Sequence, residues 1–330
     1  MTLRWWNANQ PVVAFTLPVL LLGFTGIALI FGAPADVFSD AGLAYGWLFG
    51  GLQDWPVIRK VIACVLLFVE AMGIYYLIDR HGLLPQRGYL PAALFVLLIS
   101  AVPEVLWLHP ATVSLAFLLP AADRVLRLSR SERATALVFD AGLFVALASL
   151  FYLPAILLIA LVPVALIYFR AFAWREWVIP WMGLGFPYLW IAGYYQWMVG
   201  SLQPLADHWA TAFSQWAPAF PTLVPQRVFL GVLLLLAVLA LTPFLRWIGT
   251  NKHRARKNLY MMVWLALLGA FIAGFSHHYL AVAITFSGWP IALYLSNYFQ
   301  QSRLRWLAEV FFWMLLLSIA LQQVFIWVNI

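Results

Sequence analysis

The chain has 330 residues, of which 65% are hydrophobic and only 9% are charged. A soluble core of this size cannot bury so much apolar surface, so the composition excludes an ordinary soluble protein and indicates that lipid is the solvent. The formal net charge of +7 does not indicate nucleic-acid binding, because basic residues of membrane proteins mark cytoplasmic loops and face anionic lipid. The single cysteine, Cys64, excludes a disulfide framework and a cysteine metal site.

Apolar stretches separated by short polar breaks run through the whole chain. A membrane span needs roughly 20 mostly apolar residues, because a helix rises 1.5 Å per residue across a hydrocarbon layer about 30 Å thick. The stretches lie at 12–32, 58–78, 89–103, 111–128, 135–152, 154–170, 177–199, 227–247, 260–275, 279–298 and 307–328. We therefore predict an all-α polytopic membrane helix bundle of about 11 transmembrane helices. With no internal repeat, residues 1–330 form a single integral membrane domain.

Basic residues are distributed very unevenly between the two sides that these spans define. All but three of the 19 Lys and Arg residues fall on the side of the N-terminus, the exceptions being Arg59, Lys60 and Arg227. Positive residues mark the cytoplasmic side, so the N-terminus is predicted to be cytoplasmic. An odd number of spans then places the C-terminus on the outer, periplasmic side.

Two of the predicted outer loops are long, at about 33–57 and 200–226. The first contains Asp36 and Asp40, whose spacing projects both carboxylates from one face of a helical turn. They could bind a divalent cation or act as a general base, or simply cap a helix in a solvated loop. In the second loop, residues 205–216 predict a short amphipathic helix lying in the interface, as a cover for a substrate or as a loop anchor.

Acids and histidines recur in the shorter outer turns. Glu104 and His109 lie between two prolines, where they could share a proton or a ligand, or simply form a structural turn. The pair His277 and His278 precedes the tenth span and could bind an anion or a metal. Adjacent residues point apart on a helix, so joint ligation by these two histidines needs a turn.

Two carboxylates lie inside predicted spans, where a charge costs roughly 2.5–3.5 kcal/mol on insertion scales. Glu70 is near the middle of its span and is expected to face the bundle interior, with a hydrogen bond to a neighbouring helix as the structural interpretation. Asp140 lies nearer the cytoplasmic end and is expected to pair with an arginine of the loop between the fourth and fifth spans.

Between about residues 80 and 200 the sequence is similar to a family of Bacteroidota membrane proteins of similar length that has no assigned function. The stretches that carry this resemblance are RHGLLPQRGYLPAALFVLLISAVPEVLWLHP, RSERATALVFDAGLFVALASLFYLPAILLI and FRAFAWREWVIPWMGLGFPYLWIAGYYQW. The resemblance implies a multi-pass protein of a bacterial inner membrane.

The layout of the chain also resembles the GT-C superfamily of polyprenyl-phosphate-sugar glycosyltransferases. The shared features are a cytoplasmic N-terminus, a long acidic first outer loop, a basic fourth-to-fifth loop and a long outer loop after the seventh span. The resemblance implies a catalytic acid at Asp40 or Asp36, with Glu104 as a second acid. It also implies that basic residues hold the polyprenyl phosphate, a role we assign to Arg227, His277 and His278.

Features of the GT-C pattern are missing, which keeps two other functions open. The first outer loop has no adjacent Asp-Glu pair and no Asp-x-Asp, and no extramembrane sugar-binding domain follows. A non-catalytic scaffold, with protein partners in a cell-envelope assembly, is therefore the alternative to an enzyme. A transporter with a polar path around Glu70 is the third.

Overall fold

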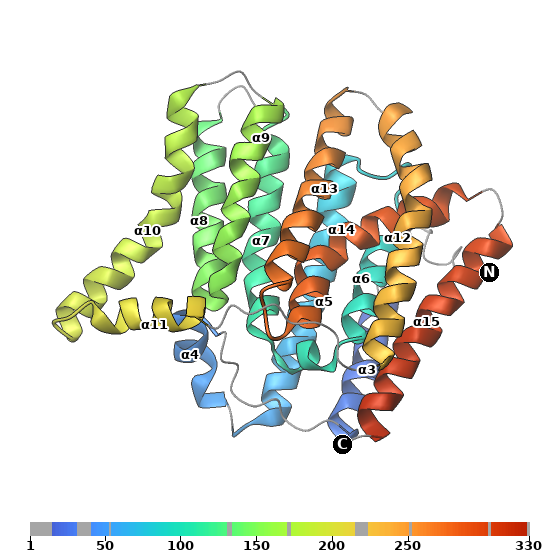
Figure 1. The fold of residues 1–330 in the computed structure, drawn as a ribbon, viewed down its shortest axis with the longest axis horizontal. Coiled ribbons are helices and arrows are strands. Elements are labelled where there is room, and N and C mark those ends of the chain that lie inside the picture. Colours follow the sequence, from blue (N-terminus) through green and yellow to red (C-terminus); the bar gives the residue numbers. More distant parts are fainter. Residues whose placement is uncertain are drawn as a thin grey trace.

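The computed structural model describes residues 15–31, 41–52, 54–130, 134–169, 173–214, 224–250, 253–302 and 305–328. These residues form an all-helical fold with 13 α-helices, drawn in Figure 1. The first half of the chain contains α3 (Thr16–Phe31), α4 (Leu43–Phe49), α5 (Pro56–His81), α6 (Leu90–Ser100), α7 (Pro110–Arg127), α8 (Thr135–Phe151) and α9 (Leu161–Phe169). The second half contains α10 (Trp174–Met198), α11 (Gln203–Ser214), α12 (Val224–Thr250), α13 (His253–Ala273), α14 (Tyr279–Gln301) and α15 (Arg305–Val328). Three 3-10 segments complete the fold: η1 (Gly50–Leu52), η2 (Pro103–Trp107) and η3 (Leu153–Ala160).

Four of these helices are long and apolar enough to cross a membrane, by length and composition. They are Pro56–His81, Val224–Gly249, Tyr279–Gln301 and Trp306–Val324, in α5, α12, α14 and α15. In a bilayer the backbone must satisfy its own hydrogen bonds, which a helix does within one segment. The chain is therefore a helical membrane protein.

Each of the other predicted stretches also contains a helix, but among the described residues only the four helices above meet this criterion, so the prediction of about 11 spans is not confirmed. Two of the other stretches are short or begin as a 3-10 helix. The stretch at 89–103 contains the 11-residue α6, which is only about 16 Å long at 1.5 Å per residue. It ends early because Val102 precedes Pro103 and is held in an extended conformation. The stretch at 154–170 begins with the 3-10 segment η3 and becomes α-helical only in α9.

The centre of the bundle is formed by α6 and α14. Every residue of α6 is buried, and α14 packs against α6, α12 and α13. On one side α8 packs between α7 and α10, and on the other α12 packs against α15, as Figure 1 shows. The predicted amphipathic helix is present as α11, which lies below α8 and roughly at right angles to it, at the left of Figure 1.

The two carboxylates predicted inside spans have different environments. Glu70 is only 1% exposed, so its predicted position in the bundle interior is confirmed. The expected hydrogen bond to a neighbouring helix is not seen, since neither carboxylate oxygen has a partner among the described residues. Asp140 pairs with Arg124 at 3.0 Å. This arginine lies in the last turn of α7 rather than in the loop that follows it.

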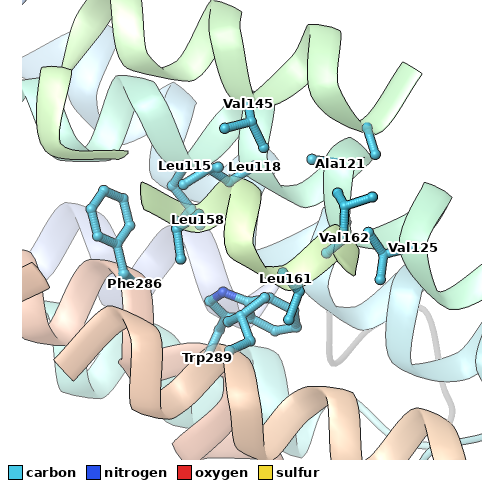
Figure 2. Close-up of a pocket in the computed structure, with 13 residues that line it drawn as sticks. Leu115, Leu118, Ala121, Val125, Val145, Leu158, Leu161, Val162, Phe286 and Trp289 are labelled. Carbon is cyan, nitrogen blue, oxygen red and sulfur yellow. The ribbon is translucent and has the colours of Figure 1, made fainter. Parts of the chain in front are cut away.

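An apolar cavity lies between α7, α8, α14 and the η3–α9 segment (Figure 2). Its volume is about 20 Å³, and Leu115, Val162 and Trp289 are among its lining residues. A water molecule needs about 10–15 Å³ and two to four polar partners, so an apolar gap of this size stays dry. The cavity is a packing gap and is too small to hold a sugar or a lipid chain.

Candidate functional site

The candidate site lies where η2, the start of α7 and the start of α14 meet at one end of the bundle. Pro103 begins η2 and Pro110 begins α7, and between them Leu108 has a positive φ of 61°. This sharp corner places Glu104 on η2 and His109 at the N-cap of α7. The N-cap residue of α14 is His278. The three ionisable side chains therefore come from separate parts of the chain.

Glu104 and His278 form a carboxylate–imidazole pair. The distance between His278 Nδ1 and Glu104 Oε2 is 2.8 Å, and both side chains are partly exposed. The rings of His109 and His278 meet edge-on, with centroids 5.5 Å apart. One ligand atom from each of the three residues lies within 4.8 Å of the others. The three side chains therefore form one compact cluster.

His109 is buried, and a backbone contact sets the position of its ring proton. Its Nδ1 accepts a hydrogen bond from the backbone amide of Ala111 at 3.1 Å. A neutral imidazole has one donor and one acceptor nitrogen, so Nε2 carries the proton. Burial, and to a smaller degree the neighbouring His278, lower the pKa of His109 to about 3. His109 is thus a neutral hydrogen-bond donor at physiological pH.

This proton position bears on whether the cluster holds a metal. Two histidines and one glutamate are a familiar ligand set for zinc. A zinc-bound imidazole gives one nitrogen to the metal and donates a hydrogen bond from the other. A metal bound at Nε2 of His109 would place the ring proton on Nδ1. Nδ1 could then no longer accept the hydrogen bond from Ala111 that caps α7. The geometry therefore favours His109 as a donor over His109 as a metal ligand.

The first residues of α12 lie next to the cluster. The Tyr279 hydroxyl donates to Gln226 Oε1 at 2.8 Å, which joins the start of α14 to α12. Both Glu104 and Arg227 lie close enough to interact electrostatically with this tyrosine. The structure thus brings Glu104, Arg227 and His278 to one end of the bundle.

The other predicted site residues are placed differently. His277 is exposed, and the carboxylate–imidazole pair does not include it. Asp36 and Asp40 lie outside the described residues, so their predicted role as acids stays a prediction. The described chain resumes at Ala41, which pairs with Tyr152 in an isolated bridge. The Tyr152 ring is 6.4 Å from the His109 ring.

Two basic residues near this site were not assigned a role from the sequence. Arg59 and Lys60 are only 6% and 2% exposed, and both contact Trp107 of η2. The charge distribution of the sequence places them with Arg227 among the basic residues of the outer face. The signal that could have revealed them is their position inside the apolar stretch 58–78, since a cation within a span must face protein or water.

Comparisons with protein-family models, with curated proteins and with solved structures found no match to this chain. The class of protein is therefore defined by the fold alone, as a helical membrane protein with an ionisable cluster at one end. Any function must be argued from the chemistry of that cluster.

Proposed function

We propose that the chain is a multi-pass protein of a bacterial inner membrane that acts on a polyprenyl-phosphate-linked sugar at the periplasmic face. In this proposal about 11 helices cross the membrane in a GT-C-like arrangement. The observation that carries it is the Glu104–His278 pair, formed by residues 174 positions apart beside the buried His109. Glycosyl transfer needs a base for the acceptor hydroxyl and a group that stabilises the departing phosphate.

The pair suits proton transfer. A carboxylate that accepts the Nδ1–H of an imidazole leaves the lone pair on Nε2, where it can act as a general base. Glu104 would therefore orient His278, and His278 would take the proton from the acceptor. His109 would donate a hydrogen bond from Nε2, and Arg227 would stabilise negative charge on the phosphate. Asp40 and Asp36 keep their predicted role as a second base or as ligands of a divalent cation.

A transfer assay tests these roles. Purified protein would be mixed with undecaprenyl phosphate carrying a radiolabelled sugar and with an envelope extract that supplies the acceptor hydroxyl, and loss of label from the undecaprenyl phosphate would be measured. We expect Glu104→Gln and His278→Gln each to lower the rate about 100-fold, as for loss of general-base catalysis. The control is Glu176→Gln, since Glu176 lies in the first turn of α10 at the other end of the bundle.

Two results of this assay would contradict the proposal. The first is a loss of label with the wild-type chain that does not exceed that with empty micelles in the presence of the acceptor extract, with glucose, mannose, arabinose and N-acetylglucosamine each tested as the donor sugar. The second is an equal rate for His278→Gln and the wild type, which would remove the Glu104–His278 pair from the mechanism.

The proposed orientation has its own test. The ends of α5, α7 and α12 that carry Arg80, Arg124 and Arg246 are expected to be cytoplasmic. A phosphatase reporter, active only in the periplasm, should be active when fused after Ile330 and inactive when fused after Asn251. The reverse pattern would overturn the span assignment.

A non-catalytic scaffold is the second candidate, and the exposed face of α10 favours it. The second half of this helix extends away from the bundle in Figure 1. It carries a wide apolar groove lined by residues that include Trp190, Tyr194 and Trp197. Trp and Tyr are enriched in the buried cores of protein interfaces, so a membrane helix of a protein partner would fit this face. Failure of the transfer assay would leave this function in place.

A further inference from the structure

Two adjacent basic side chains in the second turn of α5 are buried against η2. Arg59 Nη2 donates to the backbone carbonyl of Trp107 at 3.3 Å. Lys60 Nζ lies 3.5 Å from the centroid of the Trp107 ring. The Tyr45 hydroxyl, which donates to the carbonyl of Leu108 at 2.7 Å, also interacts with Arg59. These contacts hold both cations next to η2.

The positive charge of this pair is not balanced within the described part of the chain. No ion pair joins Arg59 or Lys60 to any carboxylate of the described residues. In the same set of residues Lys60 Nζ has no hydrogen-bond partner. Burying an unpaired charge is unfavourable, and the cation–π contact of Lys60 offsets only part of that cost. A nearby anion would stabilise both buried cations.

We propose that Arg59 and Lys60 bind a phosphate group. The guanidinium can donate two parallel hydrogen bonds to phosphate oxygens, and the ammonium adds a compact second charge. The polyprenyl phosphate that leaves in the proposed reaction is a monoester with between one and two negative charges at neutral pH, which matches two cations, whereas the sugar-linked phosphodiester carries one. This assignment adds two cations to Arg227. It replaces His277 and His278, to which the sequence-based prediction also gave the phosphate.

The position of the pair favours a phosphate carried by a lipid. Lys60 is four residues after Pro56, the start of α5, which is about 6 Å along the helix axis. That depth is close to the membrane interface, where lipid phosphates lie. Trp107, which both cations contact, lies on η2 with Glu104, so a phosphate at Lys60 would lie next to the segment that carries one member of the Glu104–His278 pair. The inference rests on the proposed function for the identity of this lipid substrate.

Binding can be measured without turnover. Purified full-length protein in dodecyl maltoside, without phosphate buffer, would be titrated with farnesyl phosphate, with inorganic phosphate and with farnesol. We expect farnesyl phosphate to raise the melting temperature saturably and farnesol to have no effect. Lys60→Met and Arg59→Met should each weaken binding at least about tenfold, as expected for loss of a charge-assisted hydrogen bond. Lys257→Met, near the start of α13 at the opposite end of the bundle, should bind as the wild type does.

The experiment distinguishes a free phosphate from a lipid phosphate, and it defines the results that would overturn the proposal. Equal affinity for inorganic and farnesyl phosphate would support a phosphate site but assign it to the free anion. Normal binding of farnesyl phosphate by both Lys60→Met and Arg59→Met, or no binding by the wild type, would overturn the proposal. Because the readout is binding, it decides the matter whether or not the transfer assay detects an enzyme.

The ligand-free Lys60→Met variant gives a second and independent readout. Replacing an unneutralised buried charge with an apolar side chain removes its desolvation cost, so the melting temperature should stay the same or rise. Breaking a buried ion pair would instead destabilise the protein strongly, because the partner charge would be left buried and unpaired. A large fall in the melting temperature would therefore show that an acid of the chain already neutralises Lys60, and would overturn the phosphate site.

Discussion

Gly142→Ala should lower the thermal stability of the protein by several degrees. A Cβ at Gly142 of α8 would lie 2.1 Å from the backbone oxygen of Pro180 on α10. A Cβ at Gly183 of α10 would in turn lie 2.3 Å from the backbone oxygen of Phe139 on α8. Contacts under 3.0 Å are essentially never seen for real Cβ atoms, and backbone atoms cannot rotate away. The two helices would have to separate.

Close backbone approach at small residues is a common way for membrane helices to associate. Overpacking such a contact typically costs about 1–3 kcal/mol, so Gly142→Ala and Gly183→Ala should each lower the melting temperature in detergent by several degrees. The protein would be heated and then analysed by size-exclusion chromatography. Its melting temperature is the heating temperature at which half of the monodisperse peak is lost.

Gly185→Ala is the matched control for this crossing. Gly185 lies on α10 two residues beyond Gly183, but a Cβ there meets nothing within 4 Å. Glycine in a helix interior is less stable than alanine by roughly 0.5–1 kcal/mol, so this change should stabilise slightly. If Gly142→Ala and Gly185→Ala melted at the same temperature, α8 and α10 could not cross as closely as described.

The helix positions were largely predictable because lipid leaves the backbone few alternatives. An apolar stretch in a bilayer must satisfy its own hydrogen bonds, so the stretch predicted at 177–199 forms the helix Trp174–Met198. The exceptions are explained by proline. Pro103 ends the α6 region early and begins η2, and Pro154 lies in the first turn of η3. Apolar run length alone does not distinguish such short or 3-10 segments from a full span.

The site was predictable as a set of candidates but not as an arrangement. The sequence identifies Glu104, His109 and His278 as polar residues of outer turns. Their pairing depends on η2 packing against the start of α14, a contact between segments 174 residues apart. The burial of Arg59 and Lys60 depends likewise on Trp107 lying over α5. Only tertiary packing brings these groups together, and no local pattern encodes it.

The buried His109 should make the stability of the protein depend on pH. Its pKa is about 3 in the folded protein, against an ordinary value near 6.5. The unfolded chain therefore takes up a proton below about pH 6.5 that the folded chain does not. The contribution of His109 to stability is complete above pH 6.5 and is lost as the pH falls towards 3. At pH 5 the free energy of unfolding should be about 2 kcal/mol lower than at pH 7 from this group alone.

The comparison that isolates this effect is His109→Asn. An asparagine at the N-cap can still accept the hydrogen bond from Ala111, so the start of α7 is retained. Glu104 and His278, which face the same site, are present in both proteins, so their contributions cancel to first order in the difference. Melting temperatures of the wild type and the variant would be measured from pH 8 to pH 4.5.

The difference in melting temperature between the wild type and His109→Asn should narrow as the pH falls below 6.5, because only the wild type loses the stability of a buried neutral imidazole. Parallel curves over that range would mean that His109 is protonated as readily in the folded protein as in the unfolded chain, and the donor assigned to its Nε2 would have to be withdrawn.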